Sequence, residues 1–92
     1  MDQVLQNLPI FYEVTNTIEV VVHVSEILEY KQRNNLIAAL EEEYGIASAE
    51  FCSYRHHLML VKYDSNMYSS QDVLASVKSH NVNARLMARY KW

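Results

Sequence analysis

The chain has one cysteine, one glycine and one proline in 92 residues, and each scarcity excludes a class of structure or site. With Cys52 alone, no disulfide can form within the chain, which fits the cytoplasmic location that we expect. A single glycine excludes a glycine-rich phosphate-binding loop. Pro9 breaks any helix that runs through it, and we expect residues 1–16 to form an N-terminal appendage.

Long apolar runs and an excess of positive charge are also missing. No apolar run reaches the roughly 20 residues that a membrane-spanning helix needs. The first six residues have neither the basic start nor the long apolar region of a secretory signal. The formal net charge of −3 argues against non-specific binding to nucleic acid, which needs a basic surface. We therefore expect one domain whose partner is neither a membrane nor nucleic acid.

The hydrophobic pattern predicts six secondary-structure elements. Apolar β-branched residues alternate over 17–24, which predicts the first strand. Apolar residues recur at helical spacing over 29–44, and Gly45 suits the left-handed position that ends a helix. Asn81 suits the same position after the second helix. The other expected elements are strands at 47–54, 57–64 and 82–87 and a helix beginning at Ser69.

This order of elements predicts the α+β class and a ferredoxin-like βαββαβ sandwich. Its four-stranded antiparallel sheet would carry two helices on one face. Ser69 and Asp72 have the spacing of a capping box at the start of the second helix. The expected organisation is an appendage at 1–16, a domain at 17–88 and a C-terminal tail at 89–92.

Three segments resemble the heavy-metal-associated domain family, which includes copper chaperones and the N-terminal modules of metal-transporting ATPases. Residues 45–51, GIASAEF, resemble the family's G-V-x-x-A-x-V, and residues 59–64, MLVKYD, resemble its V-x-V-x-Y-D. Residues 69–74, SSQDVL, resemble the opening of the family's second helix. The resemblance covers about residues 18–87 and implies the same ferredoxin-like fold.

The family's metal site lies in G-M-x-C-x-x-C, between the first strand and the first helix. Counted back from Gly45 without gaps, this motif falls on residues 26–32, EILEYKQ, where Ile27 replaces the methionine as an apolar plug. Glu29 and Gln32 stand at the two cysteine positions. Their hard oxygen atoms replace the soft thiolates that monovalent copper prefers. The scaffold therefore resembles a degenerate member of the family, and we expect no cofactor and no tight copper(I) site.

The remaining candidate metal ligands are His23, His56, His57, His80 and Cys52. His56 and His57 are adjacent, so in a strand they would point to opposite faces. His80 precedes the last strand and would approach Glu29 in this fold. Two protein ligands leave a zinc site incomplete, because zinc usually has at least three. Metal handling through His80, Glu29 or Cys52 is therefore the alternative function.

One face of the expected sheet is too apolar to lie in water. The residues expected against the helices are Val20, Val22, Phe51, Met59, Val61, Ala84 and Leu86. The opposite face then presents Val21, His23, Cys52, Tyr54, Leu58, Leu60 and Met87, although a solvated face should alternate to polar residues. We expect this face to be covered by the appendage, the aromatic tail at 90–92, a second copy or another protein.

The function expected from these observations is protein interaction without catalysis. No pairing of a nucleophile with a base appears in the sequence, so we expect no enzymatic activity. The expected interaction face consists of Val21, Tyr54, Leu58, Leu60 and Met87, for a protein partner or for self-association. A third possibility is an accessory domain that binds a small molecule at a dimer interface.

An acidic run, Glu41 to Glu43, ends the first expected helix. The helix macrodipole disfavours acids there, by about 0.3–1 kcal/mol each at most. Helix stability therefore does not explain the run, and we expect it to serve solubility or an acidic contact surface.

Overall fold

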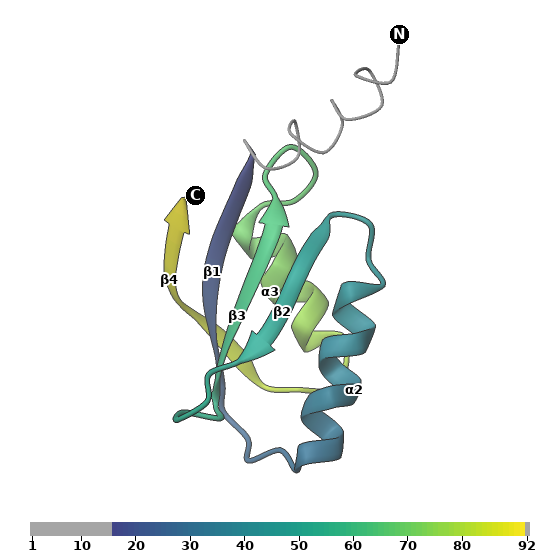
Figure 1. Cartoon of the computed structure of the whole chain (residues 1–92), viewed down its shortest axis with the longest axis vertical. Coiled ribbons are helices and arrows are strands. Elements are labelled where there is room, and N and C mark those ends of the chain that lie inside the picture. Colours follow the sequence, from purple (N-terminus) through teal and green to yellow (C-terminus); the bar gives the residue numbers. More distant parts are fainter. Residues whose placement is uncertain (1–15, 92) are drawn as a thin grey trace, which may run out of the picture.

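The computed structural model describes residues 16–91, with the backbone alone over the last four, and has the six expected elements in the expected order. They are β1 (Thr17–Val24), α2 (Tyr30–Glu41), β2 (Ile46–Phe51), β3 (Leu58–Asp64), α3 (Ser70–Lys78) and β4 (Ala84–Lys91). The strands form one antiparallel sheet in the order β2-β3-β1-β4, packed with the two helices (Figure 1). The predicted α+β class and ferredoxin-like βαββαβ sandwich are confirmed.

One hydrophobic core lies between the sheet and both helices. Alternate residues of β1 and β3 point into it and meet buried residues of α2 and α3, which places the helices on the same face. The residues expected to face the helices all lie in this core or pack against it: Val20, Val22, Phe51, Met59, Val61, Ala84 and Leu86. Within the described residues, no helix combines the length and the apolar character that crossing a bilayer requires.

The start of α3 has the predicted capping box. The Asp72 N–H donates to Ser69 Oγ over 3.1 Å, and the Ser69 N–H donates to Asp72 Oδ2 over 2.8 Å. The hydrogen bond from the Ser69 backbone is the main reason why the pKa of Asp72 lies below its usual value of 3.8. The ionised carboxylate therefore stabilises the folded state.

Replacing Asp72 with asparagine should lower the stability of the domain at neutral pH. A depressed pKa in the folded state contributes stability above the unfolded pKa, and this is lost as the pH falls through the folded value. The difference in urea midpoint between the wild type and Asp72→Asn should therefore narrow as the pH is lowered from about 7 to about 3. A difference that stays constant over this range would contradict the role of the charge.

The last strand is longer than predicted. Val22 pairs with Leu86 whereas Val21 pairs with Ala88, so Met87 is an extra residue that forms a β-bulge. Beyond the bulge, β4 continues beside β1 to Lys91. Residues 89–91 therefore continue the sheet, and the prediction that the last strand ends at 87 is wrong. A bulge shifts the alternation of apolar residues by one position, which hides the continuation from a period-two pattern. The rest of the expected tail, residue 92, and residues 1–15 of the expected appendage lie outside the described residues.

The two predicted helix ends have different outcomes. Asn81 adopts the expected left-handed conformation, with φ at 64°. The first helix, α2, ends at Glu41 with Glu42 as its C-cap, and Gly45 does not have a positive φ, so the left-handed cap predicted there is wrong. Gly45 instead lies close to another side chain: a Cβ at this position would be 3.2 Å from the Cβ of Met67, which would have to shift by a few tenths of an ångström.

Two of the three acids that follow one another at the end of α2 have partners within the fold. Glu41 Oε2 accepts a hydrogen bond from the Ala49 N–H of the edge strand β2 over 3.0 Å. Glu43 Oε1 accepts hydrogen bonds from Tyr68 Oη (2.9 Å) and Ser76 Oγ (2.6 Å), which connects the end of α2 to α3. The bond to Glu43 is the main cause that raises the pKa of Tyr68. These contacts explain two acids that the macrodipole disfavours.

Candidate interaction surface and metal loop

The loop between β1 and α2, where the resemblance places the family's metal motif, is held by hydrogen bonds. The Ser25 N–H donates to the Asn83 carbonyl (2.8 Å), and the Asn83 N–H donates to Glu26 Oε2 (3.2 Å). Together these bonds join the loop to the segment that precedes β4. Arg33 of α2 also reaches back, and its Nη1 donates to the Leu28 carbonyl over 2.7 Å. The loop is thus attached at both its ends.

Glu29 and Gln32, at the two cysteine positions, take part in starting the helix. Glu29 is the N-cap of α2, and its N–H donates to Gln32 Oε1 over 2.8 Å. In this arrangement the side chain of the third helical residue satisfies a backbone N–H that has no partner within the helix. The residues that stand in place of the two thiolates therefore stabilise the first turn of α2.

Ile27 does not act as the apolar plug of this loop, and that prediction is wrong. Its side chain is 99% exposed, whereas Leu28 packs against the core. The conformation of the anchored loop decides which residue turns inward, and counting positions back from Gly45 does not reveal that conformation.

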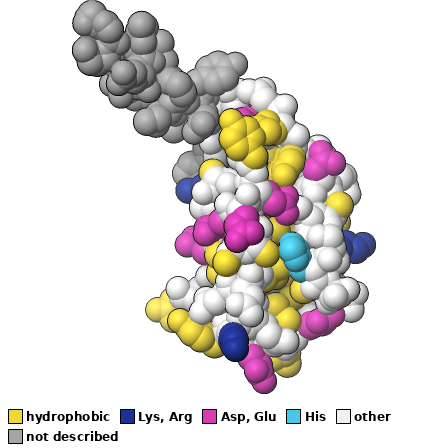
Figure 2. All heavy atoms as spheres, turned by 90° about the vertical axis from the view of Figure 1, so that its right-hand side faces the viewer, with side chains coloured by type: hydrophobic (Ala, Val, Ile, Leu, Met, Phe, Trp, Pro, Cys, Tyr) yellow, Lys and Arg dark blue, Asp and Glu magenta, His cyan; other side chains and the backbone are white. Residues whose placement is uncertain are grey.

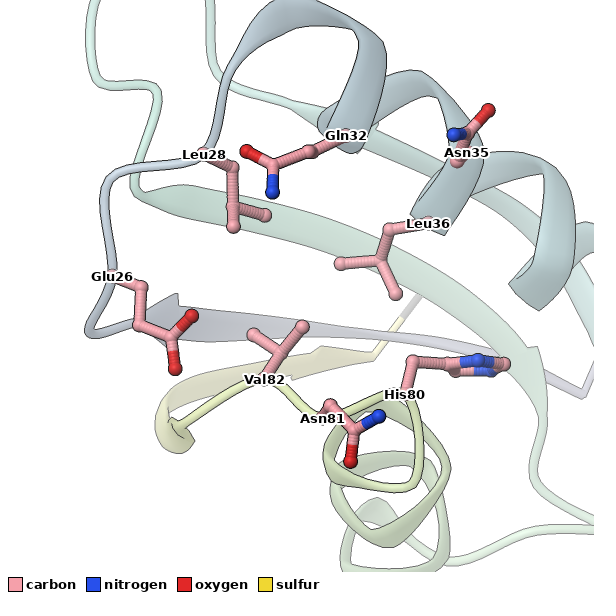
Figure 3. Close-up of a pocket in the computed structure, with 8 residues that line it drawn as sticks. All are labelled: Glu26, Leu28, Gln32, Asn35, Leu36, His80, Asn81 and Val82. Carbon is pink, nitrogen blue, oxygen red and sulfur yellow. The ribbon is translucent and has the colours of Figure 1, made fainter.

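A hollow of about 380 Å³ lies beside this loop, between the start of α2 and the segment before β4. Figure 3 shows the side chains of Leu28, Leu36 and Val82 directed toward its centre. Its polar lining residues are Glu26, Gln32, Asn35, His80 and Asn81. The hollow has an apolar floor and a polar border.

The candidate metal ligands His80, Glu29 and Cys52 do not come together in one group. His80 lines the hollow beside α2, but Glu29 does not, and the His80 ring points away from Gln32 (Figure 3). Cys52 is half-buried, and its N–H donates to the Leu58 carbonyl over 2.9 Å. Over residues 16–91, no three His, Cys, Asp or Glu side chains are grouped as a metal ion would need.

A pair of histidines that the sequence did not indicate lies at the same end of the molecule. The ring centroids of His23, in β1, and His57, in the loop before β3, are 5.1 Å apart, with 69° between the ring planes. His23 Nδ1 is buried and has no hydrogen-bond partner among the described residues. The signal that would have found the pair is the register of β1 against β3, since His23 is opposite Leu58. His56 and His57, which are adjacent candidate metal ligands in the sequence, are both exposed residues of the loop before β3.

The sheet face opposite the helices carries three apolar side chains on its two central strands. Val21 of β1 is paired with Leu60 of β3, and Leu58 is paired with His23 one step along the face. Val21, Leu58 and Leu60, which we call the apolar trio, are each half-buried. The first and third strands are thus neighbours at the centre of the sheet.

The other two residues of the expected interaction face do not belong to the two central strands. Tyr54 belongs to the loop between β2 and β3, because β2 ends at Phe51, and its side chain is 97% exposed. Met87 is the extra residue of the bulge in β4 and is 51% exposed. Neither position continues the alternation on which the prediction of a single face depended.

The side of the molecule formed by α2 has a different character. Figure 2 shows this side, where hydrophobic side chains lie in separate groups among acidic and polar side chains. The described large apolar side chains most exposed to solvent are Ile27, Tyr30, Tyr44, Tyr54, Met67 and Met87, none of which belongs to the apolar trio. The trio is thus distinct in being apolar, central in the sheet and on the face opposite α2 and α3.

Solved structures with the same fold include several metal-binding proteins. The chain superposes on a copper-binding domain of a P-type ATPase with a TM-score of 0.70 and 20% identity, over 82% of this chain and 99% of that one. Oxidised MerP from Ralstonia metallidurans aligns with a TM-score of 0.67 and 12% identity, over 78% and 99% of the two chains. The yeast copper transporter domain Ccc2a gives 0.66 and 14%, over 77% and 96%. No family model matches the sequence, and no curated protein sequence does so either. The TM-scores show that the folds are shared, and at identities of 20% or less they show the fold alone.

Proposed function

We propose that this chain is a small non-enzymatic binding module that contacts protein through the open face of its sheet. The observation that carries the proposal is the apolar trio on the two central strands, on the face opposite α2 and α3. Burying one such side chain contributes about 1.5–3 kcal/mol, so a partner that covers all three gains considerable stability.

The surroundings of the trio support the same function. Glu19 and Lys62 face each other one step along the central strands, Glu50 is paired with Leu60, and Arg85 is paired with His23. An apolar centre with a charged border is the usual composition of a protein interface. We further propose a cytoplasmic protein, on the basis of its single cysteine.

The test is the mass of the full chain in solution, measured by light scattering, with a Leu60→Lys variant. If a second copy covers the trio, the wild type should be a dimer and Leu60→Lys a folded monomer, because a charge cannot be buried there unpaired. Ala47→Lys adds the same charge at an exposed position of β2 and should leave the mass unchanged.

Deleting residues 1–12 tests whether the N-terminal appendage covers the apolar trio. If these residues cover the trio, the truncated chain should bind a hydrophobic dye and unfold at lower urea, and Leu60→Lys should weaken dye binding. A wild-type monomer that binds no dye either before or after truncation would contradict an interaction role for this face.

The alternative function is metal handling at a non-standard site of histidine, cysteine or glutamate. It is favoured by the copper-binding domains among the solved structures that share this fold. Native mass spectrometry of the chain with and without copper or zinc separates the two functions, because it reports the oligomer and the bound ion together. A monomer that retains a metal ion would favour the alternative, and a dimer would favour the interaction module whether or not it also carries an ion.

A further inference from the structure

We infer that His23 and His57 form a two-histidine site for a divalent transition-metal ion that prefers imidazole, such as zinc or copper(II). The site differs from the loop before α2, and it does not depend on the proposed interaction function. It depends on the separation of the two rings, a buried nitrogen without a partner, and a backbone that fixes both residues.

The separation of the rings suits an ion bound to both. Metal–nitrogen bonds of about 2.0–2.1 Å to a tetrahedral ion place the centres of two imidazole rings roughly 5 Å apart. The observed distance between the centroids of His23 and His57 is 5.1 Å. Two rings in edge-to-face contact also adopt such a distance, so the separation alone does not identify a site.

The unpartnered nitrogen of His23 distinguishes the two explanations. Nδ1 of this side chain is buried and has no hydrogen-bond partner in the part of the chain that the structure describes, whereas buried polar atoms in native proteins nearly always have one. A ring contact with His57 leaves this nitrogen unsatisfied. An ion held between the rings would accept the lone pair of Nδ1 in the neutral imidazole, as metal-bound histidines do.

The backbone holds both residues before any ion arrives. His23 lies in the central strand β1 and is paired with Leu58 of β3. The carbonyl of His57 accepts a hydrogen bond from the Val24 N–H over 2.8 Å. His57 is exposed, so an ion reaches it directly from solvent. No third His, Cys, Asp or Glu of the described residues completes the group, so water must fill the remaining positions. The site has one protein ligand fewer than the three usual for an open zinc site, and it should therefore bind an ion more weakly than such a site does.

Copper(II) is the suitable probe, because it binds imidazole more tightly than the other divalent ions of its series and broadens nearby proton signals. The full chain is titrated with copper(II) sulfate while the ring protons of all four histidines are followed by NMR. We expect the ring-proton signals of His23 and His57 to broaden together, before those of His56 and His80. An excess of zinc should reverse the broadening by competing for the site.

His57→Gln should weaken copper(II) binding by about tenfold or more, because it removes one of two protein ligands. His56→Gln and His80→Gln are matched controls, each of which removes an exposed imidazole and should leave the affinity unchanged. His23→Gln should lower the copper(II) affinity as much as His57→Gln does, provided that its amide NMR spectrum shows a folded domain. If His23→Gln does not fold, the result for His57→Gln, at an exposed position, decides the question. The α-amino group can also bind copper(II), but it is the same in every variant, so its contribution cancels when the affinities of the variants are compared.

Equal weakening by His56→Gln and His57→Gln would overturn the inference, and so would broadening of all four histidines in parallel. Either result would mean that copper binds exposed imidazoles without a formed site. Loss of self-association in Leu60→Lys, with copper binding intact, would separate this site from the proposed interaction face.

Discussion

Replacing Glu29 and Gln32 with cysteine should create a copper(I) site in the loop before α2 that binds one ion per chain. The two residues lie three positions apart at the first turn of α2, and the N–H of Glu29 already contacts the side chain of Gln32. Two thiolates there would supply the soft ligands that copper(I) prefers. The start of a helix also lowers the pKa of a cysteine from about 8.5 to about 3.5–7.5, which favours the thiolate.

The measurement is competition against a copper(I) chelator, in a Cys52→Ser background that leaves only the introduced thiols. Glu29→Ser with Gln32→Ser is the matched control, because it removes the same helix-start hydrogen bond and adds no soft ligand. The wild type should lose copper(I) to the chelator. If the double-cysteine variant also loses it, the assignment of the motif to residues 26–32 is wrong, although the fold is not affected. Retention of one ion by the wild type would overturn the view that this loop is degenerate.

Replacing Leu40 with alanine should destabilise the domain by about 2–5 kcal/mol, the usual effect of removing a large buried side chain and leaving a cavity. Leu40 is in α2 and is fully buried. Since small domains are stable by only about 5–15 kcal/mol, the urea midpoint should fall clearly while the m-value stays constant.

Two alanine variants of the preceding loop serve as controls for Leu40→Ala. Ile27→Ala should change the free energy of unfolding by no more than about 0.5 kcal/mol, because the side chain is exposed. Leu28→Ala should fall between the two, since Leu28 packs at the margin of the core. An Ile27→Ala variant as unstable as Leu40→Ala would mean that Ile27 is the plug after all.

Much of the local structure follows from local signals in the sequence. Alternating β-branched residues predicted β1 at 17–24, where the structure has it. The spacing of Ser69 and Asp72 predicted the capping box of α3, and Asn81 predicted a left-handed residue after that helix. Each of these features depends on residues within a few positions of one another, so the sequence contains the information directly.

The candidate site could be predicted only in part. The absence of both motif cysteines is a property of the sequence, and so is the apolar character of Val21, Leu58 and Leu60. Which residues share a surface depends on where strands end and bulge. Tyr54 lies outside the sheet because β2 ends at Phe51, and Met87 lies within β4 as the extra residue of a bulge, where it pairs with no residue of β1.

The sequence by itself determined the order of the elements, the residues that face the helices and the absence of paired thiolates. Hydrophobic periodicity and residue chemistry decide these features, and both act over short stretches of chain. The tertiary structure alone decided that Leu28 turns inward, that Glu41 and Glu43 find partners, and that His23 meets His57. Glu43 is 25 residues from Tyr68, and such contacts depend on how distant segments pack against one another, which no local pattern specifies.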